Sequence, residues 1–372
     1  MIGLLVGATL SYGAVAGYHA LSQPSAHCVL KPGADCTNAK MDGTTDNGVN
    51  ATGSYADQVQ LVNDSFENGD FAGSSLLNLN FTGDNLQNAN FSNSDLVGDD
   101  FNLANLTGAD FAGADLSAPG NATDASYQCA HLDYANFAGA DLQYADFSCP
   151  STRSGSGITM CTPSGGGASY PCTPMYKVNL SNAKLDHANL QNTQMVQANL
   201  QGATLTYASL QNTYLAQANL QGANLNSAVG SSSTVFDCVQ ASGAVFAGAS
   251  LAGASFSGSC TNLQSANFNA ANLQSANFHS ANLQGAFMSL TNLQSAYMLG
   301  ANLQGAYLGS SFIGCGTNLQ SAILYFANLQ GANLGCANLH LTLVAGANFA
   351  NTVNLPSCMT LKSDGTVNTD TC

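Results

Sequence analysis

The chain of 372 residues carries only 6 Lys or Arg against 21 Asp or Glu, a formal net charge of −15, and it contains no Trp. So few basic residues leave no basic patch for nucleic acid. Seventeen of the acids fall in residues 1–150, whereas between Leu185 and Leu361 only Asp186 and Asp237 are charged. We therefore predict an acidic first half and an almost neutral second half.

The first 21 residues contain no charged side chain. An apolar N-terminus usually indicates a secretory signal, but no Lys or Arg precedes Lys31. Four interpretations stay open for this segment. It could be an unprocessed signal or a membrane anchor that contacts a bilayer through residues 1–21. It could also be a pilin-like N-terminus that lacks the acid at position 5 (here Leu5), or an arm that pairs with a neighbouring subunit. We favour a helical assembly arm over residues 1–27, with these candidate interface residues: Met1, Ile2, Leu4, Leu5, Val6, Leu10, Tyr12 and Tyr18.

A five-residue repeat dominates the rest of the chain. Every fifth residue from Phe66 to Leu116 is Phe or Leu, a small residue (usually Ala) stands two places before most of them, and Asn or Asp stands one place before. The pattern returns at Leu132–Phe147, Leu180–Leu225, Phe246–Phe256, Leu263–Leu308 and Leu319–Phe349. A period of five fits neither a helix nor a flat strand. It indicates a solenoid of short extended pieces and turns, with the Leu or Phe and the Ala facing inward.

Two spacings indicate four pentads in each coil. Phe and Leu alternate up to Leu116, so Phe should stack on Phe along opposite faces of a four-sided tube. Cys129 and Cys149 lie 20 residues apart at equivalent positions. Strands in adjacent coils lie about 4.8 Å apart, which is within the Cα separation that a disulfide tolerates.

The twelve cysteines fall into neighbouring pairs without any CxxC spacing, which favours disulfides and an oxidising, exported location over free thiols. Cys238 and Cys260 fit the register of the repeat if Gly258 takes a central position, and Cys315 and Cys336 fit it across a one-residue insertion. The predicted disulfides are Cys28–Cys36, Cys129–Cys149, Cys161–Cys172, Cys238–Cys260, Cys315–Cys336 and Cys358–Cys372.

Four segments interrupt the repeat. Residues 148–178 are rich in Gly, Ser and Pro, contain the single Arg (Arg153), and are predicted to form an inserted loop. Residues 117–126 and 226–245 form smaller breaks. The tail, residues 356–372, is predicted to turn around Asp364-Gly365 and to cap the last coil.

The sequence ANLQSANFHSANLQGA at residues 271–286 resembles the pentapeptide-repeat family, whose motif is A(D/N)LXX. The resemblance extends over roughly residues 28–355, with breaks. It implies an all-β chain folded as a right-handed quadrilateral β-helix of 20 residues per coil, here about 14 or 15 coils and ~70 Å long. The rod would comprise an acidic part, 28–147, and a neutral part, 179–355. The resemblance implies no single activity, although the best-understood members mimic DNA and bind type II topoisomerases.

No pattern points to catalysis, to a metal or to a cofactor. The six histidines show no ligand spacing, and the glycines belong to turns and form no phosphate loop before a helix. We therefore predict no enzyme and no small-molecule substrate. The usual outward Asn is replaced at a spacing of ten by Phe287, Tyr297 and Tyr307. Phe287 and Tyr307 should therefore share one face and Tyr297 lie on the opposite face, which predicts lateral contacts between rods.

The favoured hypothesis is an exported structural protein, extracellular or at the cell surface, that assembles with copies of itself into a filament or surface layer. A DNA mimic that binds a topoisomerase is the first alternative, which needs acids along the whole rod and a reducing compartment. The second alternative is a surface-anchored module that binds a partner through the 148–178 loop.

Overall fold

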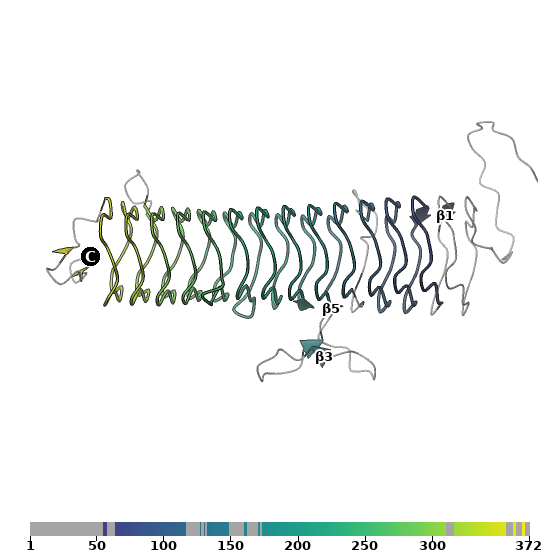
Figure 1. Ribbon diagram of the computed structural model, residues 1–372, viewed down its shortest axis with the longest axis horizontal. Helices are drawn as coiled ribbons and strands as arrows, with labels where there is room; N and C mark the ends of the chain where they lie inside the picture. The colour runs from purple at the N-terminus through teal and green to yellow at the C-terminus, as the bar shows by residue number, and fades with distance from the viewer. Residues whose placement is uncertain are drawn as a thin grey trace, which may run out of the picture.

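The computed structural model describes residues 55–57, 64–116, 127, 130, 132–148, 160–161, 170–171, 173–309, 316–354, 360–361 and 367–368. Within them the chain is a long stack of coils, with β1 (Tyr55–Asp57) toward one end and the last coils at the other (Figure 1). These residues contain no α-helix, and hence none long and apolar enough to cross a bilayer. The predicted helical arm, 1–27, lies outside them.

One pentad shows how the repeat folds. Ala281 and Leu283 are fully buried, while Asn282 between them faces outward and pairs with the next coil. Gly285 turns the corner with φ +65°, and its N–H donates to Gln304 O in the next coil at 2.9 Å. Left-handed φ is costly for residues with a Cβ, which explains the Gly, Asn and Ser that prevail at this corner position.

The coils pair through parallel bridges between equivalent residues, mostly 20 positions apart in the chain. We number the four faces by the outward residues of one coil: face 1 by Asn277, face 2 by Asn282, face 3 by Phe287 and face 4 by Asn292. Fourteen outward residues of face 3 pair in succession from Tyr55 to Val353. At ~4.8 Å per coil this stack is about 60 Å long.

Rings of Phe form ladders inside the tube, as predicted. Phe81 stacks on Phe101 on face 4 with ring centroids 4.8 Å apart, and Phe91, on the ladder of face 2, meets Phe101 edge to face with ring centroids 6.0 Å apart. From Phe236 onward the ladders move to faces 1 and 3, where Phe236 stacks on Phe256 at 4.6 Å. The inward residue thus changes from coil to coil while the four-sided section is kept.

The structure has eight named strands in its described part. Parallel pairing joins β1 to β2 (Ser75–Leu77) and β5 (Thr173–Pro174) to β6 (Thr193–Gln194). Antiparallel pairing joins β3 (Met160–Cys161) to β4 (Tyr170–Pro171) and β7 (Thr360–Leu361) to β8 (Val367–Asn368). Figure 1 draws β3 outside the stack of coils.

The inserted loop is shorter than the predicted 148–178. Thr173 already pairs with Thr193, and Met175 and Val178 are fully buried as the large and small inward residues of ordinary pentads. The sequence pattern missed this coil because Thr and Met replace Ala and Leu. The sequence separation between the paired residues Asn136 and Asn179 is 43, more than double that of an ordinary coil, so the loop is an addition to one coil.

The break at 226–245 is also smaller than predicted, since Tyr214 pairs with Val235, a single position beyond the usual spacing. Gly230 occupies a large inward position without a side chain. A methyl group there would lie 2.7 Å from Leu251 Cδ2, so Leu251 of the adjacent coil fills the space.

The structure confirms one predicted disulfide, Cys238–Cys260, with Cα atoms 4.6 Å apart. Its predicted register was wrong: Gly258 lies at a corner with φ +106°, and the next inward residue is Thr261, two places later than the repeat requires. The extra residues bring Cys260 to Cys238.

The predicted Cys315–Cys336 pair is not formed, since Cys336 is an exposed free thiol. The sequence separation between the paired residues Asn292 and Asn318 is 26, so this coil is longer than the predicted single insertion allows. Cys315 falls within 310–315, outside the described residues. The other four pairs each have at least one cysteine outside these residues and stay predictions.

Candidate interaction surface

Faces 2 and 4 of the second half carry ladders of asparagine. On face 2 the Asn302 amide donates to Asn282 Oδ1 at 3.1 Å and the Asn328 amide donates to Asn302 Oδ1 at 3.1 Å. Asn302 Oδ1 also accepts from Gln304 N at 3.2 Å. Face 4 repeats the arrangement through Asn272, Asn292, Asn318 and Asn338. These ladders satisfy their amides between coils, which stiffens the rod.

Faces 1 and 3 carry exposed apolar side chains instead. Phe287 and Tyr307 stack with ring centroids 5.0 Å apart on face 3, and they are 41% and 48% exposed. Tyr297 lies on face 1, where it pairs with Ile323, which pairs with Leu343. The prediction that Phe287 and Tyr307 share a face and Tyr297 lies opposite is therefore confirmed.

Three further exposed residues escaped the sequence analysis because they occupy corners. Phe326 has φ +57° and is 71% exposed, Leu341 has φ +57° and is 60% exposed, and Leu290 has φ +63° and is 53% exposed. Other coils place mostly Gly, Asn, Ser or Gln at these corners, so a bulky residue there was the available signal. The predicted interface residues Met1 to Tyr18 lie outside the described residues.

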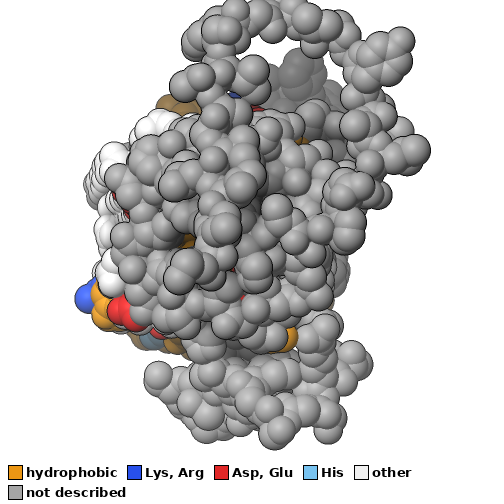
Figure 2. Space-filling view, turned by 90° about the vertical axis from the view of Figure 1, so that its right-hand side faces the viewer, with side chains coloured by type: hydrophobic (Ala, Val, Ile, Leu, Met, Phe, Trp, Pro, Cys, Tyr) orange, Lys and Arg blue, Asp and Glu red, His pale blue; other side chains and the backbone are white. Residues whose placement is uncertain are grey.

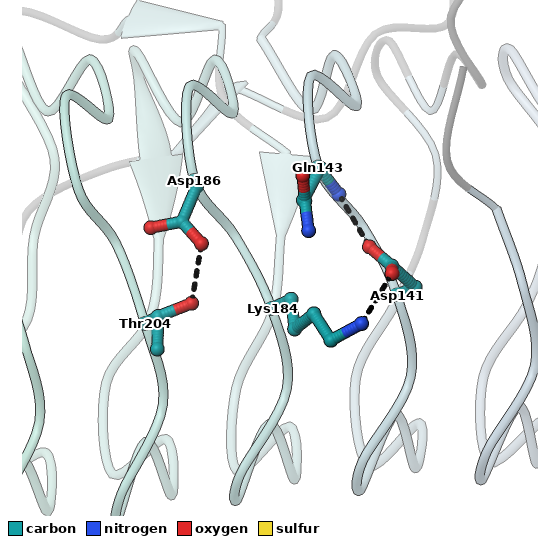
Figure 3. Close-up of polar contacts among 5 residues, drawn as sticks. All are labelled: Asp141, Gln143, Lys184, Asp186 and Thr204. Atoms are coloured by element: carbon teal, nitrogen blue, oxygen red, sulfur yellow. Dashed lines mark hydrogen bonds and ion pairs between the residues drawn. The ribbon is translucent and has the colours of Figure 1, made fainter. Parts of the chain in front are cut away.

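An ion pair on face 3 joins the coils on either side of the loop insertion (Figure 3). Lys184 Nζ lies 2.7 Å from Asp141 Oδ2, although their sequence separation is 43, and Gln143 N donates to Asp141 Oδ1 at 3.4 Å. The hydrogen bond and charge of Asp141 raise the pKa of Lys184. In the next coil Thr204 Oγ1 donates to Asp186 Oδ2 at 2.6 Å. These groups satisfy one another and hold the register.

Acidic residues form a short column that ends at this ion pair. Asp95, Asp115 and Asp141 stack in successive coils of face 3, followed by Lys184. Partial burial, and secondarily repulsion by Asp115, raises the pKa of Asp95. Viewed along the rod, charged, His and apolar side chains gather at one edge of the described surface, beside a side of uncharged polar residues (Figure 2).

Aromatic rings stack along the corner beside this column. His187 lies between Tyr144 and Tyr207, with centroid distances of 4.8 Å and 5.1 Å. At the opposite corner the ring centroids of Tyr134 and Tyr176 lie 5.6 Å apart, and the ammonium group of Lys177 lies 5.9 Å from the ring centroid of Tyr134. These exposed stacks link coils across the loop insertion in the same way as the ion pair.

We expect Lys184→Gln to lower the free energy of unfolding by only about 0.2–1 kcal/mol, because the pair is solvent-exposed. Because salt screens the ion pair, high salt should lower the free energy of unfolding of the wild type toward that of the variant. Denaturant unfolding at low and high salt checks this. A loss that is unchanged in high salt would show that the lysine acts through packing of its aliphatic stem.

The family model "Pentapeptide repeats" matches in 8 copies, over residues 85–118, 123–149, 175–202, 198–229, 208–235 and 271–309. Over these residues the chain carries the repeats of the pentapeptide-repeat family. Its fold is accordingly the right-handed quadrilateral β-helix that the sequence predicted. Pentapeptide-repeat proteins are generally non-enzymatic structural or binding proteins, and no enzyme family is indicated.

Several solved pentapeptide-repeat structures are similar. HetL, involved in heterocyst differentiation regulation in the cyanobacterium Nostoc sp. strain PCC 7120, is 21% identical over 90% of this chain and 92% of its own, with a TM-score of 0.19. Trypsin-treated QnrB1, a plasmid-mediated fluoroquinolone resistance protein, is 18% identical over 62% and 87%, with a TM-score of 0.24. A protein from the Arabidopsis thaliana thylakoid lumen is 24% identical over 29% and 68%, with a TM-score of 0.13. The curated proteins contain no match.

Among the described residues no three His, Cys, Asp or Glu side chains are grouped so that they could hold a metal ion. The described surface of this pentapeptide-repeat rod offers non-covalent contacts. Two faces carry amide ladders, the other two carry apolar side chains, and face 3 also carries a short acidic column.

Proposed function

We propose that this pentapeptide-repeat protein is a non-enzymatic structural protein that is exported and assembles with copies of itself into a filament or surface layer. The observation that carries the proposal is the arrangement of the second half. Two faces there carry asparagines whose amides hydrogen-bond to one another between coils, and they alternate with faces that expose Phe287, Tyr297 and Tyr307. Regular exposed apolar groups typically mark interaction sites. The near absence of charge from Leu185 to Leu361 leaves little repulsion between copies.

The location outside the cell is proposed from the cysteines. The disulfide Cys238–Cys260 joins adjacent coils, and structural disulfides persist in oxidising compartments. The N-terminal arm, residues 1–27, would join rods end to end, and the faces would join them side by side.

Electron microscopy of native material, with and without reductant, tests the proposal. We expect filaments or sheets of regular width, which reductant loosens where disulfides pin the coils. Dispersed rods of about 6 nm at all concentrations, the length expected for the described coils, would overturn it.

A DNA mimic is the second candidate, favoured only by the column Asp95, Asp115 and Asp141. Beyond Asp186, only Asp237 is acidic as far as Leu361, so the column is short. A purified supercoiling assay separates the two functions: inhibition of a type II topoisomerase at micromolar protein, lost on Asp115→Asn, would favour mimicry.

A partner-binding loop is a third candidate, because β3 and β4 form an antiparallel pair within the insertion. Deletion of residues 149–172 should leave assembly intact. If deletion abolished partner binding and spared assembly, the loop would be a recognition module.

A further inference from the structure

We propose, on the basis of the assembly function above, that rods associate side by side through two apolar patches of the second half, with face 1 of one copy against face 3 of the next. The face-1 patch comprises Tyr297, Ile323, Phe326, Leu341 and Leu343, and the face-3 patch comprises Phe287, Leu290 and Tyr307. The occupant of each patch is thus a second copy of this chain.

Backbone conformation supplies the first argument. Phe326, Leu341 and Leu290 hold φ between +57° and +63°, where bulky side chains are unfavourable and Gly or Asn is preferred. Their exposed fractions of 53% to 71% show that burial within one chain does not repay this cost. Residues held against local preference are typical of functional positions, and for an exposed apolar side chain that function is contact.

The area of the face-1 patch supplies the second argument. A methyl group at Gly346 would lie 2.5 Å from Phe326 Cδ1, so the ring lies beside the next corner and extends the patch along the rod. Leu341 and Leu343 flank it at 60% and 44% exposure. Together the exposed side chains offer on the order of 400 Å², taking about 200 Å² for one whole large side chain. A specific interface needs about 800 Å² per partner, so the patch can form its apolar core with the neighbouring amides as rim.

The identity of the partner follows from charge and spacing. The patches lie in a stretch without charged residues from Val239 to Leu361, so neither selects a charged partner. Another rod of the same ~4.8 Å repeat keeps its side chains in step with this one along the whole contact. Because the patches lie on opposite faces, each copy uses both, and such a head-to-tail contact extends without closing. Side-by-side sheets result.

Two variants separate the patches. Phe326→Asn/Leu341→Asn removes the centre of the face-1 patch and places a residue that tolerates positive φ at both corners, so folding is retained. Phe287→Asn/Tyr307→Asn removes the two stacked rings of the face-3 patch and restores the Asn seen at Asn267 and Asn333. The matched control is Leu103→Asn, a corner residue with φ +62° and 40% exposure in the first half.

We expect wild type and Leu103→Asn to form sheets or bundles in electron micrographs, and each double variant to give only structures one rod wide. A mixture of the two double variants should give structures two rods wide, since one intact contact remains. If wild type assembles and either double variant still forms sheets, or if the mixture stays one rod wide, the patch assignment is wrong. If wild type itself neither associates nor forms filaments, the proposed function fails instead.

Discussion

Replacing Asp99 with asparagine should stabilise the rod at neutral pH. Asp99 is fully buried at an inward position that is usually Ala, and its Oδ1 accepts from Leu79 N at 2.8 Å. Its Oδ2 has no hydrogen-bond partner in the described structure, and neither has the buried hydroxyl of Tyr127. Asparagine keeps the acceptor for Leu79 N and removes the ionisable group. We expect a gain of about 1–3 kcal/mol in the free energy of unfolding.

The gain should depend on pH in a defined direction. Burial raises the pKa of Asp99 well above its usual value, with smaller contributions from Asp95 and Asp100. The folded chain therefore holds this proton more tightly than the unfolded chain, whose Asp pKa is about 3.9. The contribution of protonated Asp99 to the free energy of unfolding is therefore fully present below that pH and is lost as the pH rises toward the folded pKa. The advantage of Asp99→Asn should accordingly be small at acidic pH and grow as the pH rises.

Thermal midpoints measured from pH 3 to pH 8 check this result, with hydrogen exchange of the Leu79 amide as the local readout. The control is Asp110→Asn, since Asp110 faces outward between Asn90 and Asn136 of the adjacent coils and surface changes usually stay within about 0.5 kcal/mol. A wild type more stable than Asp99→Asn at pH 7, or an advantage that shrinks with rising pH, would contradict the assignment.

Shortening Phe101 to alanine should cause the largest loss in the first half. Its ring stacks on Phe81 and Tyr127 with centroid distances of 4.8 Å and 5.2 Å, and it meets Phe111 edge to face with centroids 5.7 Å apart. Loss of a buried Phe side chain costs about 3–5 kcal/mol, because the cavity cannot close in a close-packed interior. The stack that joins three coils would be interrupted.

Phe101→Leu is the matched variant, because Leu210 occupies the equivalent inward position of face 4. It should cost less than about 1.5 kcal/mol. In a repeat array each coil contacts only its neighbours, so hydrogen exchange in Phe101→Ala should quicken near Phe81 and remain unchanged near Leu283. Equal destabilisation by both variants, or uniform exchange along the rod, would contradict this expectation.

The five-residue period was sufficient to predict which residues point inward, because a solenoid coil has one inward pattern and every neighbour repeats it. Leu283 and Ala281 lie inside and Asn282 outside, as predicted, and Phe287 shares a face with Tyr307. Phe stacking followed from the predicted coil of four pentads. These are local rules that hold at any position along the rod.

Only the tertiary structure decided where the insertions end and which unusual residues the coils accept. Backbone pairing between coils placed Met175 inside, brought Lys184 to Asp141 across the inserted loop and left Cys336 as an exposed free thiol. The buried Asp99 and the exposed Phe326 likewise break the composition rule for their positions. A residue's place in a solenoid depends on the register of the coil before it, and that register is fixed by hydrogen bonds between segments far apart in the sequence.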